Sequence, residues 1–377
     1  MQLALLLVWV VAGLSSCRDK ATDDDVDHQG GKPTIIAGVD RSAKSVRKSP
    51  ALVEEDEAPR RMGNPCLPSL SIPSEVPPPL SATDGQPPRQ PPGTREYWIT
   101  VEPECWNVAP AAAKSVTDRI TASQATFLAL RFHAYSRGFG KKLPADPLLM
   151  LAGPVIEANV GDKIVIHFRN LDHFRKHPHS MHLHGVHYES NMDGAYSPDD
   201  PERPGTAVRY GEVFTYTYEA RADSAGVWPY HDHSVEGALN TSTGMFGAVR
   251  IHSSSEPRFD REFYLFMHGL EPGVTGLTRD FDAFNGRVYM DDAPHLMVKK
   301  GQVVRLNVLG FGNEFHTFHV HGFRWERQGV FEDVRQIGPA MAWFVQFQAD
   351  NAGMWMYHCH VEQHMLNGMM GMFMVED

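Results

Sequence analysis

The sequence predicts an all-β protein built from two β-sandwiches in tandem, and three observations support that fold class. Short runs rich in β-branched and aromatic residues alternate with turn residues from Tyr97 to the C-terminus. Long apolar periodicity of the helical kind is absent. The runs fall into two sets, divided by the polar stretch at residues 253–257. Greek-key sandwiches are the default fold for such a pattern.

Each set supplies enough strands for one sandwich. The first set of predicted strands covers residues 97–101, 126–135, 155–158, 163–168, 213–218 and 247–252. The second set covers residues 262–267, 288–289, 303–308, 315–321, 343–348, 353–358 and 371–375. We therefore place one domain in residues 95–255 and the other in 256–377. A chain of 377 residues with 42% apolar content can fill two such cores.

The first 94 residues are predicted to lie outside both sandwiches. Residues 3–14 form an apolar run that is too short to span a bilayer but suits the core of an export signal. The small residues before Cys17 resemble a bacterial lipobox, so residues 1–17 predict a signal peptide with lipid attached at that cysteine. We expect an exported protein, either periplasmic or anchored to a membrane of the cell envelope. Residues 18–94 carry charge runs, and eleven of the 27 prolines fall between Pro59 and Pro92, which predicts a disordered tether.

Charge and cysteine content narrow the class further. The net charge is −11 and no basic cluster is present, which argues against a nucleic-acid partner. Of the four cysteines, Cys66 and Cys105 either pair in an oxidising compartment or remain thiols.

The last strand-like segment carries a metal-ligand pattern. Side chains alternate faces along a strand, so Cys359 points one way while His358 and His360 point the other. A thiolate with His364 five residues later and Met369 ten residues later is the ligand set of a blue-copper site. The paired histidines behind the strand require a second metal centre.

Histidine pairs of the form His-x-His supply that centre. One such pair is weak evidence, because neighbours on a strand face are often solvated. Four pairs, the last enclosing a cysteine, are hard to obtain by chance; they are His182 with His184, His231 with His233, His319 with His321, and His358 with His360. His316 lies three residues before the third pair.

This pattern resembles the multicopper oxidases over residues 97–377, and among them most closely the bacterial two-domain small laccases. The resemblance implies cupredoxin-like domains and four copper ions per active unit. It assigns the type 1 copper to His316, Cys359, His364 and Met369, with Met370 as the alternative to the last. It assigns the type 2 copper to His182 and His319, and the type 3 pair to His184, His231, His233, His321, His358 and His360. Asp232 stands where the first domain would need a cysteine, so that domain is expected to carry no blue site.

The resemblance also implies a reaction. One-electron oxidation of phenolic or aromatic donors would be coupled to four-electron reduction of O₂ to water, with His364 bordering the donor pocket. Alternatives are an oxidase of Cu(I) or another metal ion, a copper nitrite reductase and a non-enzymatic copper-binding protein. The nitrite reductases keep their blue site in the first domain and lack the His-Cys-His bracket, which disfavours that alternative.

Two residues are candidates for supporting roles. Asp193 lies nine residues after His184 and matches a family acid near the copper cluster, where it would relay protons; an ordinary Asp-Gly turn explains it equally well. Tyr188 matches a tyrosine near the type 2 copper in small laccases, where a buried side chain would pack or lend an electron; we favour packing. Some relatives carry an acid directly after the last type 1 histidine, a position that Met365 occupies here.

Two further clusters are interpreted without a metal. Seven of the seventeen methionines lie between Met354 and Met374, which suggests either core packing or the handling of a soft metal ion, as in Cu(I) oxidation. Met354 and Met356 alternate along one strand and Met372 and Met374 along another, so we predict core packing. His173, His177 and His179 precede the first histidine pair and are predicted to be solvated loop residues.

The last prediction concerns assembly. Each domain supplies four of the eight cluster histidines, so a first domain must face a second one. A head-to-tail contact between subunits can close into a ring. The resemblance to small laccases implies a homotrimer with the copper cluster between subunits, acting on O₂ and a small reducing substrate.

Overall fold

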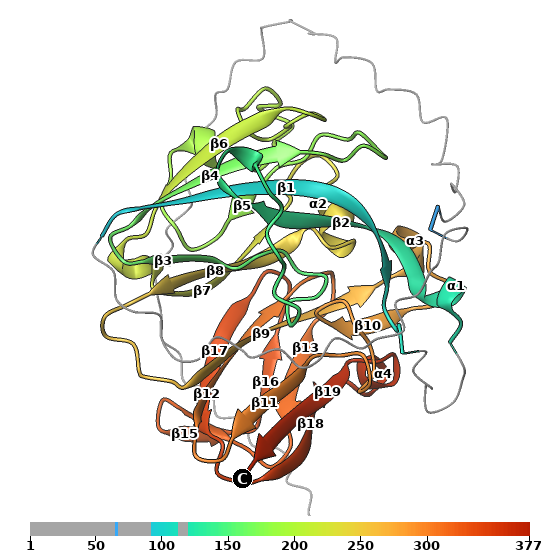
Figure 1. Cartoon of the computed structure of the whole chain (residues 1–377), viewed down its shortest axis with the longest axis vertical. Helices are drawn as coiled ribbons and strands as arrows, with labels where there is room; N and C mark the ends of the chain where they lie inside the picture. Colours follow the sequence, from blue (N-terminus) through green and yellow to red (C-terminus); the bar gives the residue numbers. More distant parts are fainter. Residues whose placement is uncertain (1–64, 67–91, 112–119) are drawn as a thin grey trace, which may run out of the picture. The chain divides into compact units, whose positions relative to one another are not determined.

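The computed structural model describes residues 65–66, 92–111 and 120–377, all of which lie in one compact unit, residues 59–377 (Figure 1). The predicted signal peptide, Cys17 and almost all of the predicted tether lie outside the described residues.

The first sandwich consists of two four-stranded sheets, with the strand orders β2-β1-β4-β6 and β3-β8-β7-β5. Its strands are β1 (Thr94–Asn107), β2 (Thr126–Tyr135), β3 (Ile156–Asn159), β4 (Lys163–Asn170), β5 (His182–Leu183), β6 (Val213–Glu219), β7 (Gly226–His231) and β8 (Phe246–His252). Alternate residues point inward and form a buried core that includes Ile99, Phe168 and Tyr230.

The second sandwich pairs a four-stranded sheet, β10-β9-β12-β17, with a five-stranded sheet, β11-β19-β18-β13-β16. The strands of these sheets are β9 (Arg261–Leu270), β10 (Phe281–Phe284), β11 (His295–Lys299), β12 (Val303–Gly310), β13 (His316–Val320), β16 (Val334–Ile337), β17 (Ala342–Gln348), β18 (Gly353–Cys359) and β19 (Met370–Glu376). A separate hairpin joins β14 (Trp325–Arg327) to β15 (Val330–Glu332). The all-β prediction of tandem sandwiches is confirmed.

Helices are short and connect the strands. The α-helices are α1 (Ala122–Ala125), α2 (Gly237–Ser242), α3 (Pro272–Thr275) and α4 (Glu362–Leu366). The 3₁₀ helices are η2 (Arg137–Phe139), η3 (Ser190–Met192) and η4 (Ala222–Ser224). No helix in the described part of the chain has the length and apolar character needed to cross a membrane.

A shared apolar cluster joins the two sandwiches. Phe246 of β8 stacks on Phe311 with ring centroids 4.7 Å apart and also contacts Phe266 of β9. The predicted boundary between residues 255 and 256 falls between the end of β8 and the start of β9. Because residues 59–377 form one unit, that boundary stays a prediction.

The predicted strand at residues 288–289 is wrong. Tyr289 has a left-handed backbone with φ of 63°, and its N–H donates to the carbonyl of Gly368 at 2.7 Å instead of joining a strand ladder. The side chains of Val288 and Tyr289 are nevertheless buried, which explains why the segment resembles a strand. The strands of this region are β10 and β11, on either side of it.

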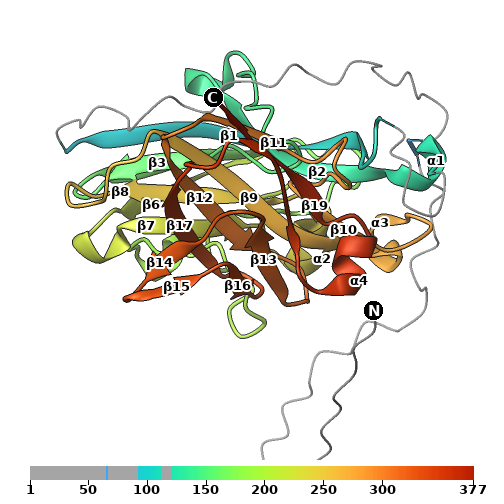
Figure 2. The same cartoon turned by 90° about the horizontal axis from the view of Figure 1, so that it is seen from below.

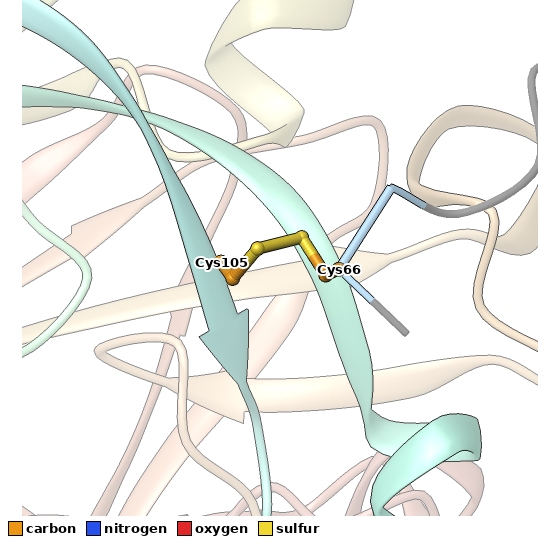
Figure 3. The surroundings of a disulfide bond; sticks show 2 residues. All are labelled: Cys66 and Cys105. Carbon is orange, nitrogen blue, oxygen red and sulfur yellow. A yellow bond between two sulfur atoms is a disulfide. The ribbon is translucent and has the colours of Figure 1, made fainter. Parts of the chain in front are cut away.

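The structure resolves the alternatives for two cysteines. Cys66 and Cys105 form a disulfide with their Cα atoms 5.5 Å apart (Figure 3). The bond attaches the fully buried Cys66 to β1 of the first sandwich.

The prediction that the C-terminal methionines pack in the core is wrong in part. Met369 and Met370 are buried, but Met354 is 74% exposed and its neighbours on the same face of the sheet are partly exposed. The aromatic residues between them, such as Tyr357 and Phe373, fill the core instead. Strand alternation therefore places the methionine face outward.

Candidate metal centres

Three predicted ligands converge inside the second sandwich. His316 begins β13, Cys359 ends β18 and His364 lies on α4; all three are buried. Their ligand atoms lie within 4.8 Å of one another. The two Nδ1 atoms are 3.0 Å apart, and the Cys359 sulfur is 3.6 Å from Nδ1 of His364. The geometry brings two imidazoles and a thiol to one point.

The surroundings of this group fit a soft metal ion. Burial, with a further contribution from His364, lowers the pKa of His316 to about 3, so that its imidazole is neutral and able to act as a ligand. The hydrogen bond with Cys359 raises the pKa of His364. Two imidazole nitrogens and a thiol sulfur gathered at one buried point are a donor set that suits copper.

The structure distinguishes the two candidates for the axial ligand. The carbonyl of Met369 accepts a hydrogen bond from the Cys359 N–H at 3.1 Å, and Met369 belongs to the same buried cluster as Cys359. Met370 pairs with His358 in the ladder of β18 and β19 and packs in a different cluster. This placement favours Met369, whose role as a ligand stays a prediction.

Four histidines of the first sandwich form a quartet at the end of β5 and β7. Ring centroids lie 4.9 Å apart for His182 and His184, 5.3 Å for His184 and His231, and 5.5 Å for His231 and His233. Nε2 of His184 is 3.2 Å from Nε2 of His231. Burial lowers the pKa of His184 to about 3 and that of His231 to about 4, which keeps both rings neutral.

A matching quartet lies at the ends of β13 and β18 of the second sandwich, where His321 and His360 directly follow the two strands. Ring centroids lie 5.1 Å apart for His319 and His321 and 5.2 Å for His358 and His360. Nε2 of His321 is 3.1 Å from Nε2 of His358. Burial lowers the pKa of both of these histidines.

Both quartets orient their rings by the same device. In each quartet two rings direct Nδ1 at a backbone carbonyl, which leaves Nε2 as the free lone pair. The pairs are His182 with Asp193 at 2.7 Å, His231 with Asp232 at 2.8 Å, His319 with Asp333 at 2.6 Å and His358 with Cys359 at 2.8 Å.

The quartets do not meet within one chain. Among residues 92–111 and 120–377, no ring contact or hydrogen bond joins a histidine of one quartet to a histidine of the other. The second-sandwich segment that borders the hollow beside His182 and His184 is residues 340–342. Each quartet is therefore half of the eight-histidine set that the sequence predicts.

Asp193 and Tyr188 both lie beside His182. The Asp193 carboxylate is 3.3 Å from Nδ1 of His182 and pairs with Arg203 at 3.2 Å. The Tyr188 ring centroid is 6.3 Å from that of His182, and desolvation together with Asp193 raises the tyrosine pKa to about 12. Tyr188 is 37% exposed and therefore not buried in this chain, and the choice between packing and electron transfer stays a prediction.

Sequence reasoning missed His179, which is fully buried and not a solvated loop residue. Its ring lies 3.1 Å from Asp172 and 3.4 Å from Asp232. Burial alone would lower the pKa of His179, but hydrogen bonds to the two carboxylates outweigh it and raise the pKa to about 9. The signal was in the spacing, since His179 precedes His182 by three residues just as His316 precedes His319.

Two carboxylates lie on the outer side of His364. Nε2 of His364 is 2.8 Å from Glu314, and Asp282 of β10 belongs to the same group of ligand atoms within 4.8 Å. Figure 2 shows α4, which carries His364, beside β10. Burial raises the pKa of Asp282 to about 6. Met365, at the position of the family acid, is partly buried against an apolar cluster.

Comparisons with known proteins agree with this geometry. Two family models, both described as multicopper oxidase, match residues 150–256 and 270–377, together more than half of the chain. Ferroxidase HEPHL1 of Homo sapiens is 25% identical over 345 residues, which cover 75% of this chain and 29% of that protein. A probable nitrite reductase-hydroxylamine oxidoreductase fusion protein of Kuenenia stuttgartiensis is 32% identical over 247 residues, 60% of this chain and 27% of that protein.

A solved structure supports the fold. A crystal structure of a multicopper oxidase superimposes with a TM-score of 0.59 at 23% identity and covers 75% of this chain and 89% of that chain. This chain spans less than a third of the length of the human relative, so the likeness concerns one part of that protein. The matched domains and the cupredoxin-like neighbours lead to one conclusion. The chain belongs to the multicopper oxidase family, copper-dependent oxidoreductases that pass electrons from reducing substrates to O₂.

Proposed function

We propose that the protein is a laccase-like oxidase that couples one-electron oxidation of small donors to four-electron reduction of O₂ to water. One observation carries the proposal. The group of His316, Cys359 and His364 is joined through the backbone of Cys359 to His358 and His360 of the second quartet. An electron accepted at the sulfur side of β18 has a short covalent path to the histidine side.

The residues fit four copper ions per active unit. His316, Cys359, His364 and Met369 would hold the type 1 ion, and His182 with His319 would hold the type 2 ion. The type 3 pair would be held by His184, His231, His233, His321, His358 and His360. Bound copper would supply the one-electron redox steps and the reduction of O₂.

The chain supplies orientation and protons. Backbone carbonyls hold the quartet rings with Nε2 free, as the short Nδ1 contacts of His182 and His358 show. The carboxylate of Asp193, 3.3 Å from His182, is placed to hold and release a proton beside the first quartet. Arg203 fixes that carboxylate from its other oxygen.

Phenolic or aromatic donors are the first candidate substrates. Phe315, next to His316, is 64% exposed, and Leu366, two residues after His364, is 54% exposed. Exposed apolar side chains flanking two predicted type 1 ligands offer a surface for an aromatic ring. O₂ consumption by the copper-loaded protein with a phenolic donor tests this proposal. Turnover of nitrite instead, or copper uptake without turnover, would favour a nitrite reductase or a copper-binding protein.

A metal ion is the second candidate substrate. Glu314 and Asp282 place two carboxylates against His364, and a carboxylate pair prefers a hard cation such as Fe²⁺ to a phenol. The likeness to a protein named ferroxidase supports the same candidate. Glu314→Gln should raise the KM for Fe²⁺ by about tenfold and leave the KM for a phenolic donor unchanged. An equal change in the KM values for Fe²⁺ and for the phenolic donor would show that the carboxylates do not bind the metal substrate.

We propose further that a homotrimer is the working unit. Each chain carries two half-sites, so the first quartet of one subunit would face the second quartet of its neighbour, and rotation would close the ring. Coexpression of inactive His231→Ala with inactive His321→Ala tests the arrangement. Mixed trimers should recover part of the activity, because an intact first quartet meets an intact second one. No recovery in demonstrably mixed oligomers, or a fully active monomer by light scattering, would end the idea.

Export completes the proposal. The disulfide between Cys66 and Cys105 supports an oxidising compartment. We propose a cell-envelope location, with lipid attached at Cys17. Cys17→Ser should move the protein from the membrane fraction to the soluble fraction of the envelope. An unchanged distribution would exclude the anchor.

A further inference from the structure

The outer face of the second sandwich carries five methionines and a histidine in two adjacent rows. They lie on β11, β19 and β18, which are neighbours in that order (Figure 1). One row contains Met297, Met374 and Met354, paired in register across the three strands. The other contains His295, Met372 and Met356, paired in the same way. Each strand thus contributes two residues, two positions apart.

Strand alternation places all six on one face. The intervening residues Leu296 and Phe373 belong to the buried core of the sandwich, and Trp355 packs against that core. Residues paired across neighbouring strands project from the same side of a sheet. The six side chains therefore project from the opposite side, away from that core.

Apolar burial accounts for Met356, which packs against the apolar cluster that joins the two sandwiches, but not for the rest of these rows. Methionine is among the residues most often fully buried. Met354 is 74% exposed, and Met297, Met372 and Met374 are partly exposed. A solvated sheet face usually carries polar residues. A different property of the thioether must explain why it recurs here in register.

We propose that this face is a binding site for Cu(I). Thioether sulfur is a soft ligand that selects Cu(I) over harder ions. Side chains directly opposite on neighbouring strands start from Cβ atoms roughly 5 Å apart, so flexible methionines of one row can direct their sulfurs at a shared ion. Neither row contains a carboxylate, which removes the ligand type that Fe²⁺ or Mn²⁺ would need.

His295 is prepared as a nitrogen ligand. Its Nε2 lies 2.6 Å from the carbonyl of Met290 and donates to it, which fixes the tautomer and leaves Nδ1 with a free lone pair. The quartet histidines are oriented by the same kind of backbone contact. One imidazole among several thioethers completes a ligand set for a monovalent soft ion.

The site does not rest on the proposed oxidase reaction, because none of the six residues is a predicted ligand of the resident copper. It does adjoin the second quartet, since Met354, Met356 and His358 share one face of β18. An assay must therefore use protein whose resident sites are already filled.

The test is a Cu(I) titration of the copper-loaded, fully reduced protein without oxygen, in competition with the chelator bicinchoninate. The native chain should take up Cu(I) beyond its resident copper. A triple variant, Met354→Leu with Met372→Leu and Met374→Leu, should bind that ion at least about tenfold more weakly. Met341→Leu serves as the control, because Met341 is a 45% exposed methionine in the loop between β16 and β17. This variant should bind Cu(I) as tightly as the native chain does.

A second readout does not depend on the triple variant folding. Ag(I) is a redox-inert probe of the same softness, and it should shift the ¹³C-methyl signals of Met372 and Met374 while sparing that of Met341. Leucine keeps the apolar contacts of methionine but removes the thioether sulfur. If the methionine face served only to bind another subunit, the triple variant would therefore take up as much Cu(I) as the native chain. Equal Cu(I) uptake by native and triple-variant chains, or no shift of the row methyls with Ag(I), overturns the proposal.

Discussion

The two sandwiches carry the same histidine frame around different buried groups. His179, His182 and His184 of the first repeat the spacing of His316, His319 and His321 of the second. Each frame also has a later His-x-His pair. Its central residue is Asp232 in the first sandwich, between His231 and His233, and Cys359 in the second, between His358 and His360. Both side chains are almost completely buried.

The two frames differ in the contacts that the polar groups around Asp232 and Cys359 make. The Asp232 carboxylate accepts hydrogen bonds from the Ser180 N–H and the Asn240 amide, both at 2.7 Å, and lies 3.4 Å from His179. In the second sandwich the Cys359 sulfur and the Nδ1 atoms of His316 and His364 face one another, with the two nitrogens 3.0 Å apart. Buried polar groups are normally paired. The first frame therefore holds its buried charges through hydrogen bonds and ion pairs, while the second brings together donor atoms that suit a metal ion.

The largest expected effect comes from breaking the first network. Asp232→Ala leaves the buried His179 imidazolium with one carboxylate fewer, and should lower the free energy of unfolding by about 3–5 kcal/mol. Denaturant unfolding measures it, with Asp199→Ala at an exposed position as the control. Equal stability of the two variants would show that the network contributes nothing.

The pH dependence of stability should follow His179. Its pKa is raised to about 9 in the folded protein, so its contribution is full below the unfolded value near 6.5 and is lost as pH rises toward 9. The free energy of unfolding should fall by about 3 kcal/mol across that window. Denaturant unfolding at several pH values measures the slope, which His179→Gln should flatten. A native slope as flat as that of the variant would mean that His179 is not charged.

Asp193 lies beside the first quartet and not beside the predicted blue-copper ligands, so its substitution should affect only one of the two half-reactions. Asp193→Asn removes a proton-holding carboxylate 3.3 Å from His182, and should slow reoxidation of the reduced protein by O₂ about 10–100-fold. Reduction by the donor takes place at the other centre and should change little. Stopped-flow measurement of each half-reaction separates them, and an unchanged reoxidation rate would rule the relay out.

The smallest effect is expected at the axial position. A thioether there tunes potential and does not hold the ion, so Met369→Leu should stay blue and shift upward in potential. Met370→Leu should have no such effect, because that side chain packs in another cluster. Redox titration of both variants compares them, and a shift found only for Met370→Leu would exchange their roles.

Spacing along strands predicted the parts of the molecule in which local pattern and chemistry agree. The alternation of Cys359 with His358 and His360 predicted the two sides of β18, and the structure places the thiol and the imidazoles accordingly. The two-sandwich fold followed from the same periodicity. On β18, two methionines (Met354 and Met356) alternate with two aromatic residues (Trp355 and Tyr357). This alternation predicts that the two sets lie on opposite faces of the strand, but not which face points inward. The packing of the aromatic residues decides that.

Long-range partners could not be predicted from the sequence. The sequence alone predicts a solvated His179, because Asp172 and Asp232, which enclose it in the structure, are seven and 53 residues away along the chain. Glu314 and Asp282 meet His364 only through packing of α4 against β10. Tyr289 resembles a strand residue until its left-handed backbone is seen. In each case the tertiary fold supplies the information.

The visible spectrum of Cys359→Ser tests most directly whether the blue centre belongs to the second frame alone. The copper-loaded native chain should be intensely blue, because a thiolate bonded to copper absorbs strongly. Cys359→Ser should lose both the colour and the oxidation of donors while keeping most of the copper of the two quartets. A variant that remained blue, or that still oxidised phenols, would contradict the distinction between the two frames.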